Sequence, residues 1–275
     1  MGLVHHYEKE ERKSVVRCDR PSTDIGLLTL DNPSRRNCLS YQTLFDLRES
    51  IATLSRDKTL KVIVLAAEGP SFCAGHDLQE LRAHRRDPDG GREFYSQTML
   101  MCTELMRSII GCPYPVIAAV QATATAAGCQ LVATCDLAVA DETADFATPG
   151  VNIGLFCSTP MVALSRNIPR KRALEMLLLG DLITAPEAKE LGLINRVVPK
   201  GKVKECALEL ALKIASKSSR IITIGKSAFY RQIEEPLQAA YSDAVKVMVD
   251  NMLEPDADEG IGAFLEKRKP TWKAT

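Results

Sequence analysis

The chain has 275 residues, of which 45% are hydrophobic and 25% are charged, which is the composition of a soluble globular protein. The 35 Lys and Arg residues balance the 35 Asp and Glu residues. The chain therefore lacks the net positive charge that favours binding to nucleic acid or to membrane surfaces. No apolar run reaches the roughly 18 residues of a membrane span. The nine cysteines lack the spacing of a disulfide framework or a metal site, so we expect no metal and a reducing compartment.

The first half of the chain alternates strand and helix patterns. Residues 1–20 carry mixed charge without the pattern of a signal peptide or a typical transit peptide, and we predict an N-terminal arm there. A strand is predicted over 25–30, followed by a helix that Ser40 caps. The same patterns predict strands over 62–67, 116–120 and 136–140 and helices over 93–110 and 128–135. This alternation predicts an α/β fold with mainly parallel strands.

The last third of the chain is predicted to be helical. A helix is expected over 171–179, and a capping box at Thr184 and Glu187 begins another, which stops at Gly192. Beyond Lys200-Gly201 the apolar spacing predicts helices over 203–217, 221–233, 236–252 and 260–269. The chain therefore divides into the arm 1–20, a core 21–199 and a C-terminal helical region 200–275.

Two glycine-containing loops lie between a strand and a helix. The first is 72–77, FCAGHD, where Asp77 can cap the next helix with Glu80 at the capping-box position. The second is 126–130, AAGCQ. A helix start leaves N–H groups unpaired, and two such donors from two loops can hold an oxyanion. Ordinary strand-to-helix turns would have the same appearance.

Four segments in register resemble the enoyl-CoA hydratase (crotonase) superfamily. They are SFCAGHDLQEL (71–81), GCQLVATCDLAVA (128–140), FATPGVNIGL (146–155) and FLEKRKPTW (264–272), within a match from about Ile25 to Trp272. The resemblance implies repeated ββα turns wound into a spiral and a coenzyme A thioester as substrate or ligand in fatty acid metabolism. It also implies that the C-terminal helices build a homotrimer or hexamer, although a helical cap within a monomer is the alternative. The members most similar to this chain are mitochondrial.

Active hydratases of the superfamily carry two glutamates that add water across a double bond. By motif position these glutamates fall on Gln130 and Gly150, neither of which can move a proton at neutral pH. Losing one general acid or base typically slows a reaction by about 10²- to 10⁴-fold. We therefore expect little or no hydratase activity. Glu142 and Asp145 flank the site in sequence, but we expect them to face solvent.

The resemblance assigns the oxyanion donors to the N–H groups of His76 and Ala127. The superfamily usually has glycine at the second position, and a positive φ at an alanine there would cost roughly 1 kcal/mol. The GHD sequence also resembles decarboxylase members, in which the oxyanion hole stabilises an enolate without a glutamate, although the tyrosine of some decarboxylases is replaced by Cys157. A locally hydrogen-bonded loop histidine is the simpler reading of His76. A partner protein that kept the fold for assembly alone is a further alternative.

Coenzyme A contacts follow from motif position alone. The resemblance places Arg35 and Arg36 near the nucleotide and Ala74 in the loop that approaches adenine and pantetheine. Lys267 and Lys269 would meet the phosphates, from the same or a neighbouring subunit, although each basic residue, taken singly, is more often a solvated surface charge. Two further residues are expected to line the acyl pocket or else belong to the core: Phe156 and Met161.

Overall fold

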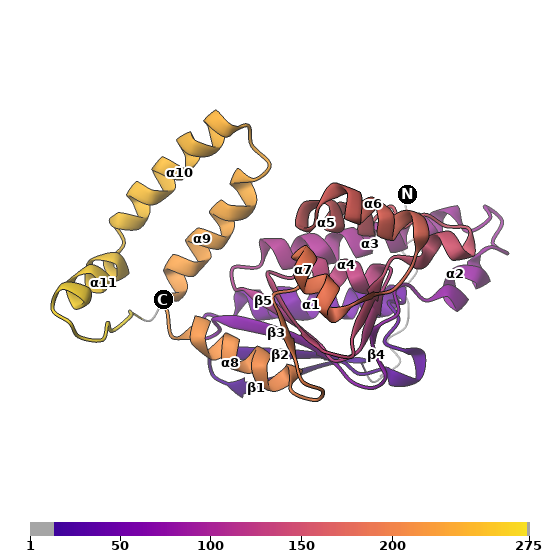
Figure 1. Ribbon diagram of the computed structural model, residues 1–275, viewed down its shortest axis with the longest axis horizontal. Helices are drawn as coiled ribbons and strands as arrows, with labels where there is room; N and C mark the ends of the chain where they lie inside the picture. Colours follow the sequence, from indigo (N-terminus) through magenta and orange to yellow (C-terminus); the bar gives the residue numbers. More distant parts are fainter. Residues whose placement is uncertain (1–13, 274–275) are drawn as a thin grey trace, which may run out of the picture.

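Two β-sheets form the centre of the fold, and helices pack around them (Figure 1). The structure is a computed structural model that describes residues 14–273. The first sheet has the order β1-β2-β3-β5-β7-β10, with β1 (Val16–Ser22), β2 (Ile25–Leu30), β3 (Val62–Ala67), β5 (Val116–Val120), β7 (Leu137–Asp141) and β10 (Arg196–Val198). The second has the order β4-β6-β8-β9, with β4 (Ser71–Cys73), β6 (Thr123–Thr125), β8 (Asp145–Ala147) and β9 (Ile183–Thr184).

The chain winds between the two sheets in repeated turns. The pairs β3/β4, β5/β6 and β7/β8 each place one strand in the first sheet and the next strand in the second. Helices follow each pair: α2 (Leu78–His84) and α3 (Arg92–Gly111), then α4 (Ala127–Thr134), then the 3-10 helix η2 (Pro149–Ile153) and α5 (Pro160–Asn167). Strands β2, β3, β5, β7 and β10 are parallel neighbours, as are β4, β6 and β8. The predicted ββα spiral is confirmed.

Strand β3 shows why the first sheet is buried on both faces. Its alternate residues Ile63 and Leu65 belong to the larger core, which α1 (Tyr41–Arg56), α3 and α4 help to build. Val62 and Val64 point the other way, into a smaller core closed by α8 (Val203–Ala215). Side chains of successive strand residues point to opposite faces, so an unbroken apolar run is expected in a sheet covered on both sides.

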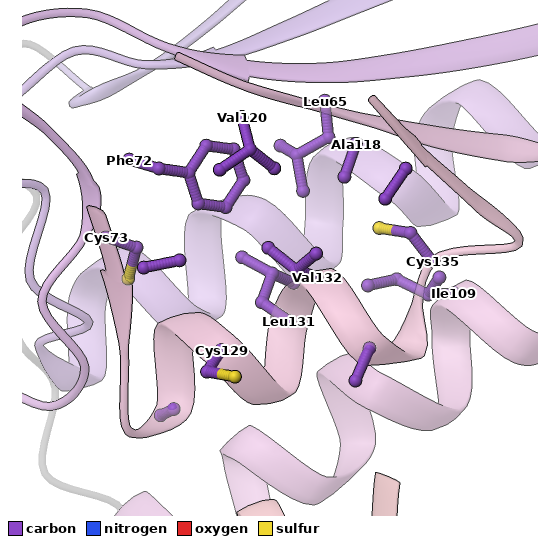
Figure 2. Packing of buried hydrophobic residues seen from close by; sticks show 14 of the residues in the cluster. Leu65, Phe72, Cys73, Ile109, Ala118, Val120, Cys129, Leu131, Val132 and Cys135 are labelled. Atoms are coloured by element: carbon purple, nitrogen blue, oxygen red, sulfur yellow. The ribbon is translucent and has the colours of Figure 1, made fainter. Parts of the chain in front are cut away.

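Helix α4 lies inside the larger core. All eight of its residues are buried, and Figure 2 shows Leu131 and Val132 beneath Phe72 of β4 and Val120 of β5. The helix has no charged residue, and helices with little polar surface are typically buried. Packing on all sides therefore fixes the position of α4 and of the second glycine-containing loop that leads into it.

The remaining helices complete the chain after the spiral. They are α6 (Arg170–Leu179), α7 (Ala185–Leu191), α9 (Ser219–Gln232), α10 (Leu237–Met252) and α11 (Pro255–Leu265). Helices α9, α10 and α11 extend away from the sheets and pack mainly on one another (Figure 1). Lys226 of α9 attaches them to the core through Asp136 Oδ2 at 2.7 Å, and Tyr230 donates to Asp136 Oδ1 at 2.9 Å. Helix α10 buries only Ala240.

Several predicted boundaries are wrong. The arm predicted over 1–20 overlaps strand β1, which pairs antiparallel with β2 from Val16 onward, and residues 1–13 lie outside the described part. The last helix starts at Pro255 rather than at residue 260 and ends at Leu265, because Pro255 fits the first turn. Helix α5 and the short strands β4, β6, β8, β9 and β10 were not predicted. Within residues 14–273, no helix is long and apolar enough to cross a membrane.

Candidate oxyanion site

Two adjacent parallel strands carry the two glycine-containing loops. Strands β4 and β6 pair in parallel, with Cys73 opposite Ala124. Parallel strands end at the same edge of their sheet, so the loop after β4 and the loop after β6 leave side by side. Asp77 caps α2 by accepting hydrogen bonds from the N–H groups of Gln79 and Glu80, whereas Ala126 precedes α4 without a side-chain cap.

Glycines bring these two loops into direct backbone contact. A β-carbon added at Gly75 would lie 2.9 Å from the β-carbon of Ala126 and 3.2 Å from the amide nitrogen of Ala127. At Gly128 an added β-carbon would lie 2.2 Å from the carbonyl oxygen of Cys73. Because β-carbons do not approach other atoms so closely, both positions need glycine for a close backbone approach. Gly75 also has φ +88°, in the left-handed region.

The two N–H groups assigned as donors are both unengaged. Among residues 14–273, neither His76 N–H nor Ala127 N–H donates a hydrogen bond, although Ala74 and Asp77 donate theirs to Arg36 and Leu39. Ala127 opens α4, where unpaired donors and the helix dipole favour negative charge. Each of the two loops therefore carries one backbone N–H that has no partner among the described residues.

The strained backbone lies one residue before the position expected from the sequence. Ala126 has φ 51° and ψ −120°, whereas Ala127 begins the helix with ordinary geometry. Conformations of this kind cost a non-glycine residue about 1–3 kcal/mol and persist where their surroundings impose them. Here Ala126 N–H donates to Ala147 at 2.9 Å, and this bond ties the loop to β8.

The imidazole of His76 is neutral and belongs to the same residue as one of the two backbone donors. Its Nδ1 lies 3.4 Å from the carbonyl oxygen of Leu39, which can only accept, so Nδ1 carries the proton and Nε2 is an acceptor. Burial lowers the pKa of His76, and the hydrogen bond to Leu39 opposes that shift. Nε2 is buried and has no hydrogen-bond partner within the described chain.

Gln130 occupies a buried position one turn into α4. Its Oε1 accepts from the thiol of Cys102 on α3 at 3.9 Å, and burial raises the pKa of that thiol to about 12. Helices α3 and α4 run in the same direction, because they lead into the parallel strands β5 and β7. Thr98 lies one turn before Cys102 on the same helix and is buried. Its hydroxyl is buried without a partner in the described residues.

Gly150 lies where a side chain would not fit. A β-carbon there would lie 2.9 Å from Sγ of Cys157 and 2.9 Å from the carbonyl oxygen of Leu155. Burial raises the pKa of Cys157, so this thiol stays protonated and behaves as a small apolar group. Thr148, two residues earlier, is fully buried and its hydroxyl has no partner in the described chain. The sequence carries no signal for the burial of Thr98 or Thr148, since a lone threonine does not indicate its position in the fold.

The predicted nucleotide contacts are not gathered at one place in a single chain. Arg35 pairs with Asp77, and Arg36 is exposed beside the first loop, where its carbonyl oxygen accepts from Ala74. Lys267 and Lys269 are exposed on the tail after α11, at the opposite end of the molecule from α2 (Figure 1). The structure therefore brings Arg35, Arg36 and Ala74 together, but not the two lysines.

The remaining residues named from the sequence differ in their burial and in their hydrogen-bond partners. Glu80 does not complete the expected capping box, because its Oε2 accepts from the N–H of Tyr41 at 3.0 Å instead. Glu142 is exposed and accepts from the N–H of Lys200, whereas Asp145 is half-buried on β8. Two apolar side chains expected at the acyl pocket are partly exposed: Phe156 and Met161. No cluster of metal-binding side chains occurs within residues 14–273.

Comparisons with known proteins show which sequences this chain is similar to. Residues 20–275 match the family model described as "Enoyl-CoA hydratase/isomerase". The chain is 48% identical over 253 residues to enoyl-CoA hydratase domain-containing protein 3, mitochondrial, of Rattus norvegicus, and the match covers 92% of this chain and 83% of that protein. A 2,3-dehydroadipyl-CoA hydratase of Escherichia coli is 32% identical, with 90% of this chain and 95% of that protein covered.

Solved structures show the same fold. The crystal structure of an enoyl-CoA hydratase from Mycobacterium smegmatis has a TM-score of 0.90 and 48% identity, and the match covers 94% of this chain and 99% of that one. Human enoyl Coenzyme A hydratase domain-containing protein 3 has a TM-score of 0.89 and 46% identity, with 94% of this chain and 100% of that chain covered.

Proposed function

Because this chain belongs to the enoyl-CoA hydratase/isomerase family of the crotonase superfamily, we propose that it binds the thioester of an acyl-CoA but hydrates enoyl-CoA poorly. The thioester oxygen would accept from the N–H groups of His76 and Ala127. The observation that carries this proposal is the pair of unengaged donors in loops held together by Gly75 and Gly128. Donors fixed before the ligand arrives need no reorganisation, and each is worth about 10²- to 10³-fold in rates of oxyanion chemistry.

Poor hydration follows from the side chains around the donors. Adding water requires a base that activates the water and an acid that protonates the α-carbon. The amide of Gln130 neither gains nor loses a proton near neutral pH, and its Oε1 already accepts from Cys102. Gly150 has no side chain, and Cys157 lies against it with a raised pKa. We therefore assign the core, residues 21–199, to acyl-CoA binding rather than to hydration.

Decarboxylation is the second candidate, because it needs the oxyanion donors and no glutamate. Loss of CO₂ from a malonyl-type thioester leaves an enolate, which the N–H groups of His76 and Ala127 would stabilise. The lowered pKa of His76 favours a neutral imidazole with a free Nε2, and a neutral group does not attract the substrate carboxylate. This feature makes decarboxylation weaker than simple binding as a proposal.

The C-terminal helical region, residues 200–275, would form a homotrimer or a hexamer. Helix α10 exposes a row of apolar side chains at helical spacing: Leu237, Tyr241, Val245, Met248, Val249 and Met252. Large contiguous apolar surfaces on a soluble protein usually mark an interface. In such an assembly Lys267 and Lys269 could reach the site of a neighbouring subunit. A stable monomer in a sedimentation experiment at micromolar concentration would contradict the oligomer.

The cellular setting is proposed from the relatives. Rat, mouse and human relatives are named mitochondrial, and we propose the same compartment and a role in fatty acid metabolism for this chain. A protein that kept the fold for assembly alone is the competing class of function. It would be indifferent to acyl-CoA, so ligand titration separates the two.

Two measurements test the proposed function. Calorimetric titration with a thioether analogue of butyryl-CoA should give saturable binding, and the absence of heat and of a thermal shift at millimolar ligand would contradict it. Crotonyl-CoA hydration should be about 10⁴-fold or more slower than in a relative with both glutamates. The native chain could instead hydrate crotonyl-CoA at an ordinary enzymatic rate and lose that activity in Gln130→Ala. That result would overturn the proposal that the chain hydrates enoyl-CoA poorly.

A restoring variant sharpens the same test. Gln130→Glu with Gly150→Glu alone would place a β-carbon against Sγ of Cys157 and the carbonyl oxygen of Leu155, so the informative variant also carries Cys157→Ala, which removes the first of these two contacts, and the folding of the variant is checked by its thermal unfolding. If the triple variant gains hydration and Gln130→Glu alone does not, the chain presents a thioester correctly and lacks only the acid and base.

His76→Ala, assayed with methylmalonyl-CoA, tests the decarboxylase alternative, because loss of CO₂ release in that variant would favour it.

A further inference from the structure

A short segment before α1 runs alongside the first glycine-containing loop. We call residues 36–39 the bracing segment. The carbonyl oxygen of Arg36 accepts from the N–H of Ala74 at 3.1 Å. The N–H of Leu39 donates to the carbonyl oxygen of Gly75 at 2.7 Å. Backbone hydrogen bonds therefore join the first loop to both ends of the bracing segment.

These bonds decide which way the N–H of His76 points. Leu39 and His76 form a parallel bridge, in which the carbonyl oxygen of Leu39 also accepts from the N–H of Asp77 at 3.3 Å. Backbone groups of successive extended residues point to opposite sides, so a residue between two bonded neighbours turns its own N–H away from the partner segment. The bracing segment therefore binds the residues on either side of His76 and leaves the N–H of His76 free for another acceptor.

Asn37 holds the bracing segment in place. It is 1% exposed and has φ +52°, in the left-handed region, which asparagine tolerates better than most side chains. Its Nδ2 donates to the carbonyl oxygens of Glu68 and Ser71 at 2.8 Å each. Its Oδ1 accepts from the N–H of Asn32 at 2.8 Å. Both amide hydrogens are used, and all three bonds go to backbone groups.

The same carboxamide also fixes the strand that carries the first loop. Glu68 directly follows β3 and Ser71 begins β4, so Asn37 holds both ends of the turn between these strands. A second amide, Nε2 of Gln121, lies 3.2 Å from the carbonyl oxygen of Ser71, but Gln121 is only half-buried and lies outside the bracing segment. Asn37 is therefore the side chain that connects β4 to the segment beside the loop.

We propose that Asn37 is a positioning residue, which acts through the bracing segment to hold the N–H of His76 in the direction that a thioester oxygen needs. The inference rests on the proposed function and names the side chain that fixes one of its two donors. A hydrogen bond weakens steeply as its angle falls, so a first loop that can turn would bind the thioester carbonyl less well and the rest of the ligand equally well. A buried carboxamide with three bonds also stabilises the fold, so the test has to separate the two effects.

The experiment compares Asn37→Gly with a matched control, Asn167→Ala. Glycine keeps the left-handed backbone at position 37 and removes the three side-chain bonds. Asn167 on α5 likewise donates to two backbone carbonyl oxygens, those of Ala133 and Ala163, and neither belongs to the first loop or the bracing segment.

Two ligands that differ by one oxygen provide the readout. Calorimetry would use butyryl-CoA and S-butyl-CoA, a thioether that lacks the carbonyl oxygen. Asn37→Gly should bind butyryl-CoA about fivefold more weakly than the native chain does and S-butyl-CoA within about twofold of native. The infrared band of the ¹³C-labelled carbonyl of bound butyryl-CoA should lie at higher frequency in Asn37→Gly than in the native chain, because the carbonyl is less polarised. Asn167→Ala should leave the affinities and the band unchanged.

Amide hydrogen exchange tests the bracing segment without a ligand. The N–H groups of Ala74 and Asp77 are bonded to this segment, so they should exchange slowly in the native chain and about tenfold faster in Asn37→Gly. If Asn37→Gly does not fold, Asn37→Asp carries the same comparison, because it keeps the size of the side chain and the acceptor for Asn32.

The other outcomes are also decisive. Equal weakening of butyryl-CoA and S-butyl-CoA would overturn the proposal, because the loss would not depend on the carbonyl oxygen, and so would an equal effect of Asn167→Ala. A variant that loses stability but keeps its affinity for butyryl-CoA, the carbonyl band and slow exchange at Ala74 and Asp77 would show that Asn37 serves stability alone. If the native chain binds neither ligand, the proposed function fails, whereas hydrogen exchange still decides whether Asn37 holds the first loop.

Discussion

The two halves of the candidate site differ in what carries their chemistry. One half consists of backbone donors at His76 and Ala127, which two glycine contacts hold in place. The other half would consist of carboxylates, and Gln130 and Gly150 stand there instead. A backbone donor tolerates any side chain that permits its geometry, whereas acid and base chemistry disappears with one substitution. We therefore expect thioester binding and proton transfer to be separable in this chain.

The largest expected effect comes from breaking the backbone half. Gly128→Ala would place a β-carbon 2.2 Å from the carbonyl oxygen of Cys73, which belongs to a buried strand and cannot move freely. We expect a loss of about 2–4 kcal/mol in the free energy of unfolding, since overpacking of this kind costs 1–3 kcal/mol and sometimes more. Affinity for an acyl-CoA analogue should fall as well, because the two loops separate.

Gly111→Ala provides the control for that variant. Gly111 closes α3 with a negative φ, and an added β-carbon would meet no atom within 4 Å. Replacing a helical glycine by alanine there should change stability by less than about 1 kcal/mol, and in the favourable direction. Urea unfolding of both variants measures the difference. Equal effects would contradict the close backbone contact at Gly128.

Much of the backbone half could be predicted from the sequence. The small residues of the two loops, the cap at Asp77 and the helix predicted over 128–135 are local signals, and the structure contains each of them, the helix as α4 (Ala127–Thr134). The capping box at Thr184 and Glu187 is also confirmed. Glu80 was misassigned because Tyr41, its partner, lies 39 residues earlier in the chain. Local patterns do not reveal such distant partners.

The side-chain half was harder to predict for physical reasons. Strands β4, β6 and β8 have three residues each, too few to show a period, yet they decide which loops meet. The contact between Gly150 and Cys157 depends on how the chain folds back after η2. The burial of Thr98 depends on which elements pack against α3. None of these is encoded in a short window of sequence.

A smaller effect of opposite sign is expected at Ala126. Ala126→Gly would release the strain of φ 51° and should stabilise the chain by up to about 1 kcal/mol. Ala133→Gly, in the interior of α4, should instead destabilise by about 1 kcal/mol or more. Thermal and urea unfolding of the two variants would show the opposite signs. If Ala126→Gly destabilises as much as Ala133→Gly, the strained geometry at Ala126 is wrong.

The smallest effect expected is a dependence of stability on pH that originates from His76, the titrating side chain of the backbone half. Burial lowers its pKa in the folded state below the ordinary value of about 6.5, so the unfolded chain binds a proton more readily. Stability from this group is therefore fully present above pH 6.5 and is lost as the pH falls below it. Between pH 8 and pH 5.5 the native chain should lose up to about 1 kcal/mol more than His76→Gln, measured by urea unfolding at each pH. Parallel curves for the two proteins would show that His76 is not buried as a neutral imidazole.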